Sequence, residues 1–240
     1  RIGRPLPSDA TFTDRVEAAE ESRAGAAPGF AALFHGRCAG DTLALWLCFF
    51  CCLFAVYSAF SWLPAMLSAE GFAPSVAGAA LTAYNLGGVF GALMCGSLIA
   101  RIGSRWPMTA CATGAAATAL AMLALPKAET TLLIVGFGLH GLFVNAVQST
   151  LYAVSAFLYP TLIRARGTAT ALGVGRLGAI SSAFAGAALI ALGGSTAFLI
   201  ALGAVMLAVA IALLSIGKHI APNPRMAPTP PRIAPTSVPT

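Results

Sequence analysis

Six long apolar runs follow one another along this chain and are separated by short polar links. They cover approximately residues 42–67, 75–100, 107–125, 130–158, 167–191 and 196–217. Each has about 19 residues or more, enough for a helix to cross roughly 30 Å of hydrocarbon. The runs are rich in Gly and Ala and show no alternation with a period of two, which favours helices over barrel strands. We therefore predict an all-α membrane bundle over residues 42–217.

The composition supports a membrane protein. Charged residues make up only 9% of the 240 residues and hydrophobic residues 58%, whereas a soluble domain is about 25% charged. A soluble protein of this size could not cover its surface with so few charges. The net charge of +6 does not indicate nucleic acid, because most basic residues lie in the links between apolar runs. The lipid bilayer is the predicted partner.

Basic residues alternate between the links, and this pattern predicts the orientation. Residues 1–41, the second and fourth links and the tail after residue 217 contain Lys and Arg, but the first and fifth links contain none. Because basic loops remain on the cytoplasmic side, we expect both ends of the chain to be cytoplasmic. Residues 1–41 are predicted to be a cytoplasmic loop, and the Pro-rich residues 218–240 a disordered tail.

Arg176 is the one Lys, Arg, Asp or Glu in the interior of any run. It follows Arg166 by ten residues, or about 15 Å along a helix, which places it near the middle of the membrane. A cation at that depth costs about 3 kcal/mol or more. Two interpretations remain open. Arg176 either faces a water-filled cavity and grips an anionic carboxylate through two hydrogen bonds, or it pairs structurally with backbone carbonyls or another carboxylate.

Other polar side chains are expected at similar depth. His140 is the group in the runs that titrates near neutral pH, and it is either a proton or ligand contact or a neutral packed side chain. Asn145 and Gln148 share one side of the same predicted helix, and Tyr84 lies in the second run. Each alone is typical of a hydrogen bond between helices. Together they suit a cavity for a small polar or aromatic solute.

The runs contain no pattern typical of an enzyme. They have no nucleophile–base pair, metal-ligand cluster or phosphate loop, so we predict no catalytic residue, metal or cofactor. Cys48 and Cys51 form a CxxC pattern inside an apolar helix without a neighbouring His or acid, and we interpret them as packing residues. No acidic residue lies within any run, so a carboxylate for proton coupling must come from other sequence.

Small residues recur at a spacing of four in two runs. Gly88, Ala92 and Gly96 form one stripe, and Gly178, Ser182 and Gly186 form the other. Such stripes predict close packing between helices.

Several motifs carry a family resemblance. Residues 141–180 contain YPT at 159–161, followed by GVGRLGAI at 173–180, and further motifs are SWLP at 61–64 and RIGSR at 101–105. This pattern closely resembles the aromatic acid:proton symporters, a branch of the major facilitator superfamily. The resemblance maps the six runs onto helices 7 to 12 of that fold.

The resemblance implies a fold of two six-helix halves, with substrate bound between them near the midplane. This chain would supply the C-terminal half, and the missing N-terminal half would be its partner. The chain begins with Arg and not Met, and we interpret it as part of a longer protein. Ala100 occupies a loop position that is commonly Asp in the family, which puts gating at this loop in doubt. The link residues interpreted as gating or topology residues are Arg101, Arg105, Arg164 and Arg166.

We therefore predict a secondary active transporter of the inner membrane that takes up a small aromatic carboxylate with protons by alternating access. Arg176 is the predicted carboxylate contact, and the predicted cavity lining is Asn145, Gln148, Tyr84 and His140. Two alternatives remain. The same fold would carry another organic anion or a drug, or the chain is a half-size membrane protein that transports nothing.

Overall fold

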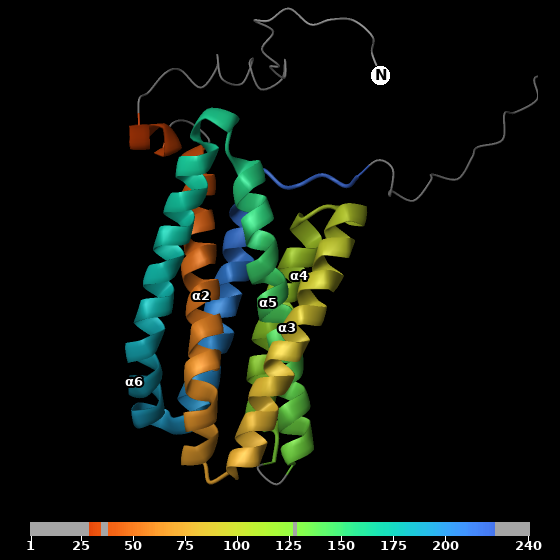
Figure 1. The fold of residues 1–240 in the computed structure, drawn as a ribbon, viewed down its shortest axis with the longest axis vertical. Coiled ribbons are helices and arrows are strands. Elements are labelled where there is room, and N and C mark those ends of the chain that lie inside the picture. The colour runs from red at the N-terminus through yellow and green to blue at the C-terminus, as the bar shows by residue number, and fades with distance from the viewer. Residues whose placement is uncertain (1–28, 35–37, 127–128, 224–240) are drawn as a thin grey trace, which may run out of the picture.

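The computed structural model describes residues 29–34, 38–126 and 129–223, which are almost entirely helical (Figure 1). Its elements in chain order are the 3-10 helix η1 (Gly29–Phe34), α2 (Cys38–Ala69), α3 (Pro74–Ile102), α4 (Arg105–Ala121), the 3-10 helix η2 (Met122–Ala124), α5 (Thr130–Leu158) and α6 (Thr161–Ser215). Within these ranges no strand occurs, so the predicted all-α fold is confirmed. Most of the predicted loop and tail, residues 1–28 and 224–240, lies outside the described residues.

The last helix, α6, reverses direction at two glycines. Gly193 (φ −158°, ψ 18°) and Gly194 (φ 60°, ψ −144°) interrupt its 55 residues. The positive φ of Gly194 is one that glycine adopts without steric penalty. Figure 1 shows the chain turning back there, so we call residues 161–192 the first arm and residues 195–215 the second arm.

These helices have the dimensions of membrane spans. In the described part of the chain, five helices are long and apolar enough to cross a membrane. The last of them, Ile163–Ser215, has 53 residues and contains the reversal. Its two arms occupy the two last predicted runs, residues 167–191 and 196–217. The chain therefore passes alternately between the two ends of the bundle, which we call upper and lower as in Figure 1.

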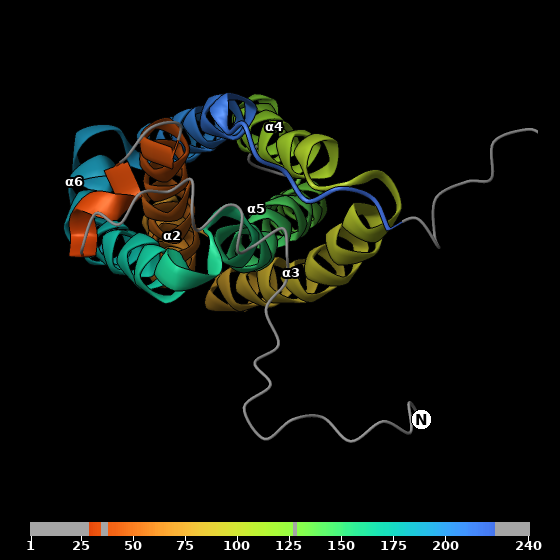
Figure 2. The same ribbon diagram turned by 90° about the horizontal axis from the view of Figure 1, so that it is seen from above.

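Two helix pairs make the most extensive contacts, α2 with α6 and α3 with α5. Figure 2 shows the first arm of α6 and α3 along one side of the bundle, and the second arm of α6 and α4 along the other. The helices α2 and α5 lie between these two rows.

Glycines bring the closest pairs to backbone contact. A Cβ on Gly91 would meet the carbonyl of Leu142 across the α3–α5 pair, and one on Gly178 would meet the carbonyl of Phe50 across the α6–α2 pair. The predicted stripe in the first arm of α6 therefore faces α2. In α3 only part of the predicted stripe makes the contact, because a Cβ on Gly88 would meet the Asn145 side chain of α5 at 2.8 Å, whereas one on Gly96 would meet nothing within 4 Å.

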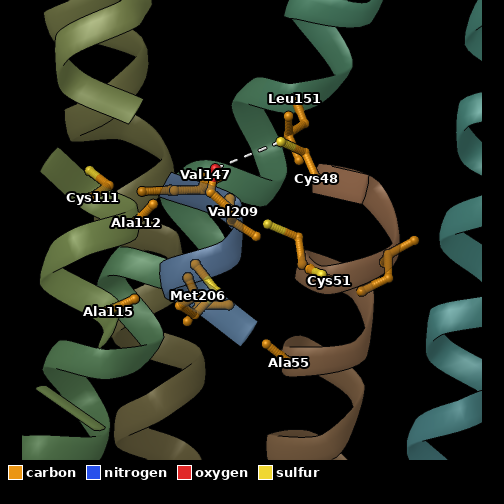
Figure 3. Packing of buried hydrophobic residues seen from close by; sticks show 14 of the residues in the cluster. Cys48, Cys51, Ala55, Cys111, Ala112, Ala115, Val147, Leu151, Met206 and Val209 are labelled. Atoms are coloured by element: carbon orange, nitrogen blue, oxygen red, sulfur yellow. Dashed lines mark hydrogen bonds between the residues drawn. The ribbon is translucent and has the colours of Figure 1, made fainter. Parts of the chain in front are cut away.

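The cysteines lie in the apolar interior. Cys48, Cys51 and Cys111 are buried among Ala, Val, Leu and Met side chains (Figure 3). The Cys48 thiol lies 3.9 Å from the carbonyl oxygen of Val209 on the second arm of α6, in the geometry of a weak hydrogen bond. Each of these cysteines is a free thiol. Their surroundings are those of small packing residues.

The chain beyond α6 returns to the connection between α3 and α4. The Asn223 N–H donates to the Ala100 carbonyl at 2.9 Å. Ser104 and Ile220 exchange two hydrogen bonds, from the Ser104 N–H to the Ile220 carbonyl at 3.0 Å and from the Ile220 N–H to the Ser104 hydroxyl oxygen at 2.9 Å. We call residues 217–223 the C-terminal strap, and Figure 1 shows it crossing the upper end of the bundle.

The strap is also held at the end of α6. The Gly217 N–H donates to the carboxylate of Asp41 in the first turn of α2 at 2.7 Å. The Arg105 guanidinium donates to the Leu214 carbonyl in the last turn of α6 at 3.3 Å. The structure thus differs from the predicted disordered tail over residues 218–223, because backbone and side-chain groups of the upper end satisfy the strap's own backbone.

Candidate functional site

Arg176 lies about halfway along the first arm of α6, on an exposed surface of the described chain. Its Nη1 donates a hydrogen bond to the hydroxyl oxygen of Tyr57 on α2 at 3.1 Å. Within the described ranges this is its one hydrogen bond. The guanidinium therefore keeps most of its donors for a group that the described helices do not provide.

The glycines beside Arg176 position its helix against α2. A Cβ on Gly175 would meet the Leu53 side chain at 2.5 Å, and one on Gly178 would meet the Phe50 backbone. Glycine at both positions permits the close approach. The GxGRxG pattern thus has a local structural reason, because the glycines bury one face of the helix while Arg176 remains on the exposed face.

Asn145 lines an open groove between α3 and α5. The groove has a volume of about 440 Å³, and its lining residues are Asn85, Gly88, Val89, Ala92, Leu93, Asn145 and Ser149. The amide nitrogens of Asn145 and Asn85 each donate to a carbonyl four residues earlier in the same helix, at 2.9 and 2.8 Å. With its nitrogen engaged in this way, each side chain presents its amide oxygen as an acceptor. Arg176 and Asn145 thus belong to different helix pairs.

His140 is fully buried between α4 and α5. Its Nδ1 lies 3.0 Å from the Ala115 carbonyl oxygen and 3.3 Å from the Thr118 hydroxyl oxygen. A carbonyl oxygen only accepts, so Nδ1 carries a proton and donates. The ring therefore links two helices and does not face the exposed surface that carries Arg176.

Tyr84 and Gln148 are also buried. Tyr84 is 1% exposed, and its ring centre lies 6.2 Å from that of His140. Gln148 is 7% exposed, and neither of its amide atoms has a hydrogen-bond partner among the described residues. A buried amide without a partner costs about 1–3 kcal/mol. Of the four predicted lining residues, Asn145 lines the open groove, and the other three are buried.

The four arginines of the links lie at helix ends. Arg101 is exposed in the last turn of α3, and Arg105 bonds the last turn of α6 as described above. Arg164 donates from Nε to the Tyr159 carbonyl at 3.3 Å, and Arg166 is exposed. The carbonyl of the neighbouring Ala100 accepts the hydrogen bond from the Asn223 N–H of the strap.

A partly enclosed cavity of about 120 Å³ lies at the lower end. Its lining is mostly apolar, and its polar members include Glu70 and Ser195. None of the predicted site residues lines it.

Tyr57 is not among the predicted substrate-binding residues, although its hydroxyl accepts the hydrogen bond from Arg176. It is an aromatic residue within an apolar run, and 119 positions separate it from Arg176. The feature of Tyr57 that is visible in the sequence is a phenol in the middle of a predicted span. Its pairing with Arg176 depends on the packing of α2 against the first arm of α6.

A bundle of membrane-length helices with a cation on an exposed surface defines a multi-pass α-helical membrane protein. The chain belongs to the Major Facilitator Superfamily, whose family model matches residues 45–238.

Three transporters are similar in sequence to this chain. The chain is 37% identical over 193 residues to the 3-(3-hydroxy-phenyl)propionate transporter of Escherichia coli, an alignment covering 80% of this chain and 45% of that protein. It is 34% identical to the gallate transporter of Pseudomonas putida, over 77% of this chain and 41% of the relative. It is 31% identical to the 4-hydroxybenzoate transporter of Pseudomonas aeruginosa, over 78% of this chain and 42% of the relative. The chain thus spans less than half the length of each of these transporters.

Proposed function

We propose that this chain is the C-terminal half of a transporter that carries a small aromatic carboxylate across the inner membrane, and that Arg176 is the contact for the carboxylate. The observation behind this proposal is the position of Arg176, an exposed cation halfway along a membrane-length helix whose one described partner is a neutral phenol. The relatives' names supply the class of substrate, since all three carry aromatic acids.

Charge balance supports an anionic partner for Arg176. A neutral phenol accepts a hydrogen bond but leaves the full positive charge at membrane depth, where an isolated cation is costly. A carboxylate offers two oxygens that match two parallel N–H donors of a guanidinium. Binding such a substrate neutralises the cation at the moment of transport.

The rest of the proposal concerns the complete protein. A second six-helix half covers the exposed surface that carries Arg176, and substrate binds between the halves by alternating access. Proton coupling uses a carboxylate outside the six apolar runs, because these runs contain no acid. Both ends of the chain face the cytoplasm, where the basic links lie.

Two of the remaining site residues are assigned different roles. Asn145, which lines the groove, contributes polar contacts to the solute. His140, held by the Ala115 carbonyl, maintains the packing of α4 on α5.

Uptake of radiolabelled 4-hydroxybenzoate tests this function in cells that express the full-length gene. We expect Arg176→Ala to abolish uptake, and Arg176→Lys to reduce it strongly because Lys keeps the charge but loses the planar fork. The charge-matched control is Lys218→Ala, which removes an exposed cation beyond the end of α6. Full uptake by Arg176→Ala at normal membrane abundance would exclude the carboxylate role. Competition by unlabelled benzoate, gallate and nicotinate then ranks these acids as substrates. Collapsing the proton gradient with a protonophore tests whether uptake is coupled to protons.

A further inference from the structure

We infer that Tyr57 is the second half of the carboxylate site: its hydroxyl oxygen orients the Arg176 guanidinium, and its hydroxyl proton is donated to the same anion. This inference rests on the proposed function, because it assigns a residue to the site where Arg176 binds substrate. It adds a positioning and specificity-determining residue from α2 to a site otherwise built on the first arm of α6.

The geometry places the two side chains in direct contact. The Arg176 Nη1 and the Tyr57 hydroxyl oxygen are 3.1 Å apart, within the normal range for an N–H···O hydrogen bond. The helices that carry them are held together beside this contact, where Gly175 and Gly178 meet α2. Because the two helices cannot move apart there without losing these contacts, the backbones that carry the phenol and the guanidinium keep a fixed separation.

The direction of the hydrogen bond decides what the pair can bind. A guanidinium donates from every nitrogen and accepts nothing, so the Tyr57 oxygen is the acceptor. The phenolic proton is then directed elsewhere and remains a donor. With Nη1 engaged, the other guanidinium nitrogens are free of bonds to described residues. The pair therefore presents donors only, from two different helices, to any group placed before it.

A donor-only pair discriminates among aromatic solutes. A carboxylate has acceptors on both oxygens and satisfies the N–H and O–H groups together. A carboxamide of the same shape would turn an NH₂ group toward one of these donors, and that donor would then lack an acceptor. Sites built to hydrogen-bond one group reject an analogue that lacks it far more strongly than apolar pockets do. Tyr57 should thus sharpen the preference for the acid over its amide.

The first test measures uptake kinetics of 4-hydroxybenzoate by the full-length protein carrying Tyr57→Phe, which removes the hydroxyl and keeps the ring. We expect KM to rise about tenfold, the effect of one hydrogen bond to a charged group, with a small change in the maximal rate. The matched control is Tyr152→Phe. Tyr152 is an exposed tyrosine of α5 whose ring packs against Phe49 at 5.5 Å, so its KM should stay at the wild-type value.

The second test measures specificity. Inhibition of uptake by benzamide is compared with inhibition by benzoate in the wild type and in Tyr57→Phe. The wild type should prefer benzoate strongly, and the preference should shrink several-fold in the variant. A purely structural role for Tyr57 would lower the amount of transporter without changing this ratio, so an unchanged ratio overturns the inference.

The third test asks whether Tyr57 acts through Arg176. In an Arg176→Lys background the fork is already lost, so adding Tyr57→Phe should raise KM much less than it does in the wild type. Equal factors in the two backgrounds would overturn the positioning role. Tyr57→His restores a hydrogen-bonding group and should recover part of the affinity; failure to do so at normal membrane abundance also counts against the inference.

These outcomes separate the two levels of the proposal. If Arg176→Lys impairs uptake but Tyr57→Phe does not, the role of Tyr57 is wrong and the proposed function stands. If neither variant changes uptake, or the wild type takes up none of the acids, both are wrong.

Discussion

The carboxylate of Glu70 accepts a hydrogen bond from the Ser195 hydroxyl at 2.6 Å and another from the Ser195 N–H at 3.2 Å. Glu70 follows the end of α2, and Ser195 begins the second arm of α6 directly after the glycine reversal. The first N–H groups of a helix lack partners within that helix, and a carboxylate there satisfies one and interacts favourably with the helix dipole. This contact therefore fixes the lower end of α2 to the start of the second arm.

Glu70→Ala is expected to lower the free energy of unfolding by about 1 kcal/mol, the usual effect of losing a helix cap. Thermal unfolding of the purified full-length protein in detergent measures the change. Glu129→Ala is the control, because the exposed Glu129 precedes α5 without a capping side-chain hydrogen bond. Equal losses in both variants would show that the Glu70 contact is not the cause.

Gly141→Ala should separate α3 from α5, because the added Cβ would meet the Tyr84 carbonyl oxygen. We expect a loss of about 2 kcal/mol or more, as for other overpacked interiors. Gly96→Ala is the matched change on the same helix pair, where the Cβ would meet nothing within 4 Å. It should be neutral or stabilise the helix by up to about 1 kcal/mol. The same detergent unfolding assay compares them, and a Gly96→Ala loss as large as that of Gly141→Ala would contradict the packing argument.

Ser104→Ala should loosen the C-terminal strap. The change removes the hydroxyl that accepts from the Ile220 N–H at 2.9 Å and lies 3.3 Å from His219 Nδ1. Trypsin cleavage after the exposed Lys218 should become several-fold faster, because cleavage requires the strap to open. Ser97→Ala is the control, since the exposed Ser97 bonds only a carbonyl of its own helix. An unchanged cleavage rate for Ser104→Ala would show that this hydroxyl does not hold the strap.

The strap should also open at acidic pH. Burial, together with the nearby Arg105 guanidinium, lowers the pKa of His219 below its ordinary value of 6.5, although the Asp41 carboxylate acts in the opposite direction. A histidine whose pKa is lowered binds protons more readily once released, so its contribution to attachment is present above pH 6.5 and is lost as the pH falls below it.

Hydrogen exchange of the amides of residues 217–223 measures this opening. After correction for intrinsic rates, protection should be lower at pH 5.5 than at pH 7.5. His219→Gln cannot titrate and should abolish the difference. Persistence of the full difference in that variant would assign the effect to another group.

The sequence predicted most of the helix positions correctly. All six runs overlap helical segments, namely α2, α3, α4 with η2, α5 and the two arms of α6, with ends differing by six residues or fewer. Continuous apolarity over membrane length needs no tertiary information, because a lone helix must satisfy its backbone in lipid. The predicted contact stripe of α3 was correct at Gly88 but not at Gly96. Gly91 and Gly96 are both small, and only the neighbouring helix decides which one is contacted.

The sequence singled out the predicted site residues but not their surroundings in the fold. Arg176 was identified from its charge, and charge in an apolar run is visible in sequence. The burial of His140 and Gln148 was not visible, because a polar residue in a helix faces a cavity or a neighbour according to the rotation of that helix.

The sequence by itself determined the class of protein, the number and length of its apolar segments and the place of Arg176 near the middle of one of them. These follow from hydrophobicity and helical rise, which are properties of local sequence. Tertiary structure alone decided that Tyr57 meets Arg176, that Glu70 caps the second arm of α6, and that Asn223 bonds the carbonyl of Ala100. Each of these contacts joins residues more than 100 positions apart, and only the packing of whole helices brings such residues within hydrogen-bonding distance.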